Sequence, residues 1–98
     1  MSTHLSITRD EADGRGRYSS PTVSSGTAEL TYRWAGKKRI IIDHTYVPPS
    51  ARGRGIAEAL VRRAVEDARV AGVLVRPHCS YAALIMHRHA DLQDVLDA

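Results

Sequence analysis

One segment of the chain has a pattern that is typical of an amphipathic α-helix. Apolar residues recur there at intervals of three and four, at Ile56, Ala57, Leu60, Val61, Ala64, Val65 and Ala68. On a helix this spacing places them in one stripe, and a glycine at position 72 is the expected C-terminal stop. The pattern therefore predicts a helix over residues 56–71 that buries one face.

Two strands are predicted before this helix. From Ala28 to Trp34, apolar and polar residues alternate as in a half-buried strand, and we expect Tyr32 and Trp34 to belong to the core. The following run, Ile40–Val47, has apolar side chains on both faces, which favours a central strand that is covered above and below. The prolines that follow cannot donate ladder hydrogen bonds and should end it.

A third strand is predicted directly after the helix, where Val73–Val75 forms a short apolar run before Pro77. A strand, a helix and a second strand in this order form a crossover unit, so residues 40–47 and 73–75 should be parallel and close in the sheet. The fold class expected is α/β or, more narrowly, α+β. It would be a mixed, mostly antiparallel sheet with a β-α-β crossover and a C-terminal helix.

The ends of the chain are described by weaker patterns. His4–Arg9 predicts a short first strand, and Asp13-Gly14 predicts a turn after it. Ser19–Gly26 is rich in serine and is expected to form a loop or an irregular edge. Near the C-terminus, Ser80 can cap a helix that runs through Met86, and Asp91–Leu96 can form a short helical turn.

Length and composition limit what this chain can be. Its 98 residues, 43% of them hydrophobic, fit one folded domain over residues 1–98. No apolar run is long enough to cross a membrane, and Cys79 is the only cysteine, so we expect a soluble, cytoplasmic protein. The net charge of +3 is small and its basic residues alternate with acidic ones, which makes nucleic acid an unlikely partner.

The turn before the helix, Arg52–Ala57, combines features of an anion-binding site. Gly53 and Gly55 let a ligand approach the backbone, and the first N–H groups of a helix are free to bind an anion such as a pyrophosphate. Arg52 and Arg54 add positive charge. The turn lacks the Gly-Lys-Ser/Thr of a nucleotide triphosphatase P-loop. Taken alone, it is equally compatible with a simple glycine-rich connection.

Several motifs around this turn occur in a recognisable order: His44-Thr45, Val47-Pro48, the Arg52–Ala57 turn, Leu60-Val61 and Pro77–Tyr81. Together they resemble the GNAT acyltransferase superfamily, and in particular its small single-domain branch, over residues 28–94. The resemblance implies acetyl-CoA as cofactor and an amine as acceptor, either a small molecule or a protein lysine. The chain departs from that branch after the cysteine motif, where it continues with residues 82–91.

The resemblance also implies which residues form the site. The cofactor's pyrophosphate would lie on the turn, with Ala59 nearby, and the acyl group would lie between two splayed parallel strands. The cofactor-binding residues expected are Val47, Arg52, Gly53, Arg54, Gly55, Ile56, Ala57 and Ser80. His44 and Cys79 would lie beside the acyl group and are the catalytic candidates.

The residues leave several roles open. A lysine-like amine must lose a proton before it can attack, and His44 is suited to act as the base, but it could equally be a histidine hydrogen-bonded in the sheet. Cys79 could accept the acyl group, donate a proton to the leaving thiolate or line the channel; we favour lining, with direct attack by the amine. Residues 87 and 89 are histidines but lack further ligands, so no metal site is expected.

The predicted function is an acetyl-CoA-dependent N-acetyltransferase. The alternative is a non-catalytic module of the same fold that binds CoA, a protein or a nucleic acid. Binding through nucleic-acid phosphates would weaken steeply with salt, whereas the acyltransferase would bind CoA through its turn. The sequence does not name the acceptor or the oligomeric state.

Overall fold

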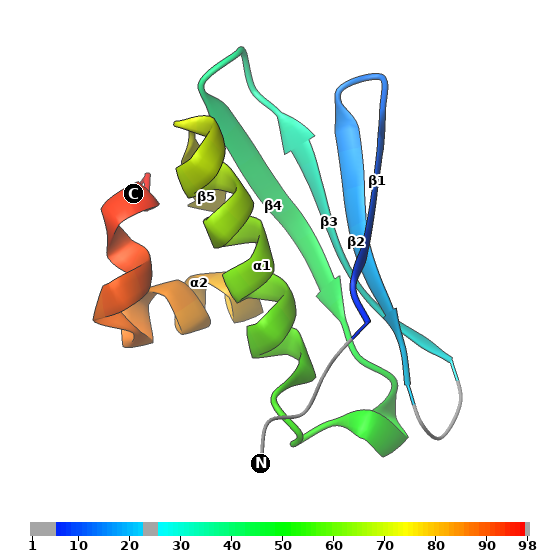
Figure 1. Cartoon of the computed structure of the whole chain (residues 1–98). Coiled ribbons are helices and arrows are strands. Elements are labelled where there is room, and N and C mark those ends of the chain that lie inside the picture. Colours follow the sequence, from blue (N-terminus) through cyan, green and yellow to red (C-terminus); the bar gives the residue numbers. More distant parts are fainter. Residues whose placement is uncertain (1–5, 23–25, 98) are drawn as a thin grey trace.

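The computed structural model describes residues 6–22 and 26–97. Its sheet has five strands in the order of the sequence, and neighbours are antiparallel except for the last pair, which is parallel. These strands are β1 (Thr8–Ala12), β2 (Arg15–Pro21), β3 (Thr27–Trp34), β4 (Arg39–Tyr46) and β5 (Leu74–Pro77) (Figure 1). The predicted fold class, a mixed and mostly antiparallel sheet with one crossover, is confirmed.

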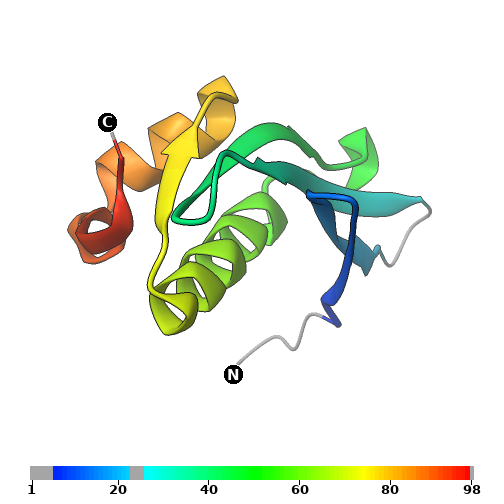
Figure 2. The same cartoon turned by 90° about the horizontal axis from the view of Figure 1, so that it is seen from above.

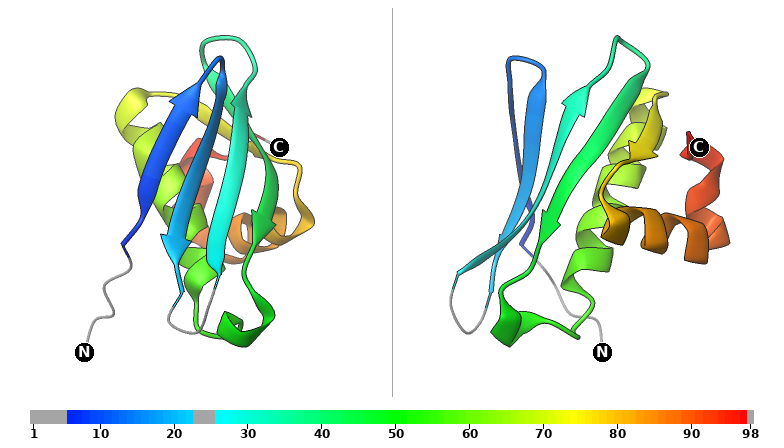
Figure 3. Two further views of the ribbon diagram at one scale, coloured as in Figure 1. Left: turned by 90° about the vertical axis from the view of Figure 1, so that its right-hand side faces the viewer. Right: turned by 180° about the vertical axis from the view of Figure 1, so that it is seen from behind.

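The helices lie on one side of this sheet, as the views from above and from behind show (Figures 2 and 3). They are the short 3₁₀ helix η1 (Pro49–Ala51), the crossover helix α1 (Ile56–Ala71), α2 (Ser80–Arg88) and a second 3₁₀ helix, η2 (Ala90–Val95). Within the described residues, no helix is long and apolar enough to cross a membrane.

Helix α1 has the bounds that its periodicity predicts. All seven stripe residues are buried, and the other face carries the charged side chains. Gly55 precedes the helix and Gly72 ends it, both in the left-handed conformation that glycine adopts at little cost. At the C-terminal end the N–H of Val73 donates to the carbonyl of Ala68, which closes the last turn.

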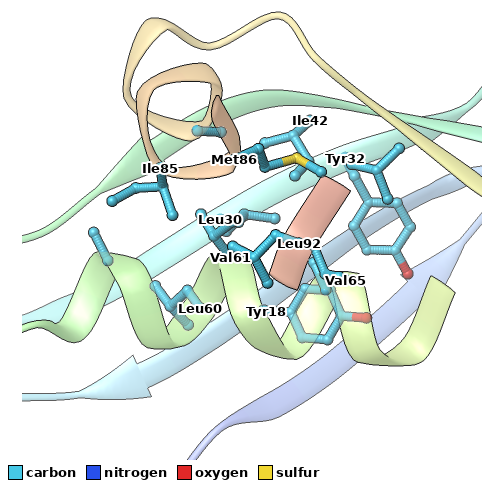
Figure 4. Packing of buried hydrophobic residues seen from close by; sticks show 14 of the residues in the cluster. Tyr18, Leu30, Tyr32, Ile42, Leu60, Val61, Val65, Ile85, Met86 and Leu92 are labelled. Carbon is cyan, nitrogen blue, oxygen red and sulfur yellow. The ribbon is translucent and has the colours of Figure 1, made fainter. Parts of the chain in front are cut away.

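The core lies between the helices and the covered face of the sheet (Figure 4). Leu30, Tyr32 and Ile42 on that face pack with the α1 stripe, and α2 and η2 add further apolar side chains to the same cluster, Ala82, Ile85, Met86, Leu92 and Val95. Tyr32 belongs to this core as predicted, whereas Trp34 is only partly buried and packs at its edge.

The N-terminal predictions are partly wrong. The first strand is Thr8–Ala12, whereas the prediction was His4–Arg9, of which positions 4 and 5 lie outside the described residues. All five residues of β1 are exposed, because it is an edge strand that pairs with β2 through its backbone. Its sequence therefore shows no alternation of apolar and polar residues. The Asp13-Gly14 turn is confirmed: both residues have positive φ, as a two-residue hairpin requires.

Strand β2 was missed, and the predicted loop over Ser19–Gly26 is wrong for its first residues, because β2 runs to Pro21. Positions 23–25 lie outside the described residues. The covered face of β2 carries Gly16, Tyr18 and Ser20, and only one of these is a large apolar residue. Gly16 is required there because a Cβ atom would lie 2.0 Å from Cζ of Tyr32.

Strand β4 contains the predicted isoleucines, and all three are buried. Ile40 and Ile42 belong to the core, whereas Ile41 points to the face without helices and pairs in register with Arg33 and Arg76. Both faces of this part of β4 are therefore covered, as expected, although the helices lie on only one of them.

The remaining boundaries move by a few residues. Strand β5 begins at Leu74, not at Val73, because the Val73 N–H is used to end α1, and it includes Pro77. Helix α2 extends beyond the predicted Met86 to Arg88, and its N-cap is Cys79, so Ser80 is its first residue and makes no capping bond. The last helical turn starts at Ala90, one residue before the prediction.

Candidate active site

The site begins where β4 and β5 stop pairing. Their parallel register ends at Ile42 opposite Pro77, while β4 continues to Tyr46. The N–H groups of His78 and Cys79 both donate to the carbonyl of Ile42, at 2.9 and 3.1 Å. The chain after β5 is thus held at Ile42. Among the described residues, no strand pairs with the second half of β4 on the edge that faces β5.

A cavity of about 410 Å³ lies next to this free part of β4. It is bounded by the end of β4, the glycine turn, the first turn of α1 and one side chain of α2. The lining residues are Thr45, Tyr46, Val47, Ala51, Arg52, Gly53, Gly55, Ile56, Ala57 and Tyr81. One continuous stretch, residues 45–57, and the distant Tyr81 therefore meet at one concave site, which is the usual shape of a small-molecule site.

The glycine turn forms one wall of the cavity. Gly53 and Gly55 have φ of 80° and 78°, and no atom lies within 4 Å of the position where either would carry a Cβ. The first helical hydrogen bond in α1 is donated by Ala59, so the N–H groups that precede it have no partner within the helix. No side chain caps them, which leaves an N-terminal dipole and free donors suited to an anion.

Two arginines belong to the turn and are arranged differently. Nε of Arg52 donates to the carbonyl of Val47 at 2.9 Å, and its guanidinium lies 6.0 Å from the ring centroid of Tyr46. These contacts tie the turn to the end of β4. Arg54 is exposed, and no carboxylate among the described residues forms an ion pair with it. It is not one of the residues that line the cavity.

The two catalytic candidates lie outside the cavity lining. The side chain of His44 is 56% exposed, stacks on Tyr46 with ring centroids 6.4 Å apart, and has Nε2 4.0 Å from a carboxylate oxygen of Glu29. Cys79 is half-buried at the N-terminus of α2 and packs against the core. Ser80 is exposed beside it and also lies outside the lining, which contains Tyr81 instead.

The structure thus brings together most of the residues expected to hold the cofactor, namely Val47, Arg52, Gly53, Gly55, Ile56 and Ala57, and leaves Arg54 and Ser80 outside the lining. Sequence reasoning missed Thr45, Tyr46, Ala51 and Tyr81. Of these, Thr45 has a polar group that the structure leaves without a partner: its Oγ1 is buried and makes no hydrogen bond within the described residues. The sequence alone does not reveal that a hydroxyl is buried without a hydrogen-bond partner.

The C-terminal histidines have other surroundings. Nε2 of His89 lies 3.6 Å from Oε1 of Glu58, in the first turn of α1, and His87 is exposed on α2. In the part of the chain that the structure describes, no group of three histidine, cysteine or acidic residues is arranged to hold a metal ion.

The fold and the site together define a GNAT-like α+β protein. The structure is similar to the NMR solution structure of a GCN5-like protein from Staphylococcus aureus, with a TM-score of 0.73 and 26% sequence identity. The similarity covers 93% of this chain and 88% of that one.

The family follows from the sequence match. Residues 17–95 match the family described as GCN5-related N-acetyl-transferase, and the chain belongs to this family. A curated relative is Protein NATD1 of Xenopus tropicalis, which is 46% identical over 39 residues. That match covers 40% of this chain and spans only 36% of the length of the relative.

Proposed function

We propose that this chain is an acetyl-CoA-dependent N-acetyltransferase that acetylates an amine, either a small molecule or a protein lysine. The observation that carries the proposal is the cavity of about 410 Å³ whose wall is the uncapped start of α1. Free N–H donors, a helix dipole and nearby arginines suit the anionic end of CoA. The apolar side chains of Val47, Ala51 and Ile56 suit its largely apolar arm.

Several residues would hold the cofactor. The N–H groups from Gly53 to Ala57 would bind the pyrophosphate, and Arg52 and Arg54 would add charge to it. Both glycines have open space where a Cβ would stand, which fits a ligand that approaches the backbone. Bound acetyl-CoA would supply an activated thioester, which the neutral amine attacks directly to give an amide and free CoA thiol.

His44 is the residue proposed to remove the proton from the amine. Protonated lysine outnumbers the neutral form by roughly a thousand to one at pH 7, so a base is needed before attack. The side chain of His44 is exposed and stacked on Tyr46, and Tyr46 also lines the cavity. The proton would pass to Nε2 or Nδ1 directly or through water. Cys79 is proposed to line the channel without forming a covalent intermediate.

The test is calorimetric titration with acetyl-CoA and CoA, with ATP as a control for general phosphate binding. The wild-type chain should bind both CoA compounds saturably and ATP far more weakly. Gly55→Glu should abolish this binding, because a carboxylate would stand where the pyrophosphate binds. Gly36→Glu is the matched control, since Gly36 also has positive φ and open space but lies in the β3–β4 turn.

Circular dichroism should show both variants folded. The comparison is informative because both substitutions place a non-glycine residue at positive φ, at a cost of roughly 1–2 kcal/mol. If Gly55→Glu binds CoA as the wild type does, the turn is not the cofactor site. If the wild type binds no CoA compound, the acyltransferase proposal fails and an interaction module on the same fold takes its place.

A further inference from the structure

Three arginines lie in one row across the face of the sheet that the described helices leave uncovered. Arg15 of β2 is directly opposite Arg33 of β3, which is opposite Ile41 of β4. Ile41 in turn is opposite Arg76 of β5. Ile42, the next residue of β4, belongs to the core on the helix side, and neighbours along a strand point to opposite faces. We refer to Arg15, Arg33 and Arg76 as the arginine row.

Arg15 and Arg33 carry like charges at directly opposite positions, an arrangement that destabilises a sheet. Arg15 is exposed and forms no ion pair with a carboxylate of residues 6–22 and 26–97. Nε of Arg33 lies 3.9 Å from Oδ2 of Asp43, which is beyond hydrogen-bond distance. An anion bound between the two guanidinium groups would offset their repulsion, so this part of the sheet favours a negatively charged partner.

Further basic side chains lie at the same end of the sheet, where the β1–β2 and β3–β4 turns are located (Figure 1). Lys37 and Lys38 in the β3–β4 turn are exposed, and neither forms an ion pair in the part of the chain that the structure describes. Arg39 and Arg76 share a single carboxylate, that of Asp97. This end of the uncovered face is therefore electropositive.

The side chains between the arginines indicate which kind of anionic partner fits. An arginine guanidinium binds carboxylates and phosphates alike. Surfaces that bind single-stranded nucleic acid also offer aromatic side chains on which the bases stack. The arginine row encloses Ile41 instead, and the adjacent row pairs Arg39 with Leu74, an exposed leucine. A polypeptide segment with acidic and apolar side chains fits this surface better than a nucleic acid does.

We propose that the arginine row binds an acidic segment of the protein whose lysine is acetylated. The inference rests on the proposed function and selects a protein lysine as the acceptor. Thr31 lies two residues before Arg33 on β3, so it shares the face of the row, and it is opposite His44. Two residues along a strand span roughly 7 Å. Acidic residues about two to four positions from the lysine would therefore reach the row while the lysine lies at His44.

The test uses two peptides of equal length with one central lysine. One peptide carries glutamates two to four positions from the lysine on both sides, and the other carries glutamines there. Fluorescence anisotropy measures binding of each labelled peptide without cofactor, and turnover with acetyl-CoA gives kcat/KM. The wild type should show about tenfold higher affinity and kcat/KM for the glutamate peptide, the effect expected of two exposed ion pairs.

The informative variant is Arg33→Glu. It should lose the preference for the glutamate peptide and favour a peptide with arginines at the same positions, and Arg33→Gln is a second variant in case Arg33→Glu does not fold. Arg88→Glu is the matched control, because it changes the net charge equally at an exposed position of α2. It should keep the wild-type preference. CoA affinity should not change in any of these variants, since neither position lines the cavity.

The outcomes separate this inference from the proposed function. If the wild type binds CoA but treats the two peptides alike, the inference is wrong while the cofactor assignment stands. An equal loss of preference in Arg88→Glu and Arg33→Glu would trace the effect to net charge and overturn the inference. So would single-stranded DNA of mixed sequence that binds more tightly than the glutamate peptide and is lost in Arg33→Glu. If the glutamate peptide binds through Arg33 but no CoA compound binds, the proposed function fails, and the docked protein is not an acetylation substrate.

Discussion

Arg69 of α1 donates two hydrogen bonds to the carboxylate of Asp94, from Nε to Oδ2 and from Nη2 to Oδ1, each at 2.7 Å. A second pair, Arg62 to Asp91 at 2.6 Å, joins the same two elements. The two-pronged contact of Arg69 with Asp94 is geometrically specific, whereas Arg62 donates a single bond to Asp91. Both pairs connect η2 to α1 at the surface, next to the buried side chains of Leu92 and Val95.

These pairs predict a loss of stability in acid. Hydrogen bonds from Arg62 and Arg69 hold the pKa values of Asp91 and Asp94 below their ordinary values. Because the folded-state pKa is depressed, the stabilisation is complete above the unfolded value of about 4 and is lost as pH falls through the folded value. We expect the Tm of the wild type to fall between pH 5 and 2 more steeply than that of Asp91→Asn/Asp94→Asn.

Thermal unfolding followed by circular dichroism at several pH values measures this difference. Asp10→Asn is a suitable control, since Asp10 lies in the edge strand and is exposed. Parallel Tm curves for the wild type and the double variant would show that the two pairs do not contribute to acid sensitivity.

Tyr18 predicts a second pH effect, in the alkaline range. Burial and its hydrogen bond to Oδ2 of Asp67, 2.7 Å long, raise the pKa of the phenol. A raised folded-state pKa means that the stabilisation is complete below the unfolded value of about 10, begins to fall above it, and is lost as pH rises through the folded-state value. Tyr18→Phe should cost about 1 kcal/mol at neutral pH and should lose less stability than the wild type between pH 9 and 11.

Urea unfolding at pH 7, 9 and 11 provides the measurement. Tyr81→Phe, which changes an exposed tyrosine, should follow the wild-type curve. If the Tyr18→Phe variant and the wild type lose the same free energy of unfolding between pH 9 and 11, the Tyr18 phenol is not the cause of the alkaline loss.

Gly16 is predicted to be intolerant of any side chain. A Cβ at this position would lie 2.0 Å from Cζ of Tyr32 and 2.2 Å from its hydroxyl oxygen. That hydroxyl is fixed by a hydrogen bond to Oε1 of Glu11, so the ring cannot move away freely. Gly16→Ala should therefore destabilise the protein by about 1–3 kcal/mol.

A double-mutant cycle with Tyr32→Leu tests this cause. If the clash with the ring is responsible, Gly16→Ala should cost much less when position 32 is leucine. An unchanged cost would place the strain in the β2 backbone instead.

His44 is predicted to affect turnover more than binding. His44→Ala should lower kcat for acetylation of a lysine-containing peptide or a polyamine by about 10²–10⁴-fold, the usual contribution of a general base. CoA affinity should be nearly unchanged, because His44 lies outside the cavity lining. His87→Ala, at an exposed position of α2, is the control. A kcat equal to that of the wild type would assign His44 a structural role only.

Cys79 is predicted to be dispensable for chemistry. If the amine attacks the thioester directly, Cys79→Ala should keep most of the activity. Mass spectrometry of the wild type with acetyl-CoA and no acceptor should show no acetylated protein. A chain heavier by one acetyl group at Cys79, together with an inactive Cys79→Ala variant, would instead establish a covalent intermediate.

The parts of the fold that could be predicted are those whose pattern is complete within one segment. The stripe of α1 and its two flanking glycines lie within residues 55–72, and both ends of the helix were predicted correctly. Strand β3 was also visible, because Ala28, Leu30 and Tyr32 alternate with polar residues. Strand β2 was not, since its covered face includes Gly16 and Ser20, which give no apolar alternation, and Gly16 is required only because of the Tyr32 ring on β3.

The sequence by itself determined the crossover helix, the glycine turn before it and the family to which the motifs belong, because helix periodicity and turn chemistry depend on neighbours along the chain. Only the tertiary structure decided that β4 separates from β5 after Ile42 and that the bulge near Thr31 places Thr45 opposite the core residue Leu30. It also decided that Tyr81 of α2 joins the cavity lining while His44 lies outside it. Strand register and the meeting of distant segments are fixed by packing across the whole fold, and a local pattern does not contain them.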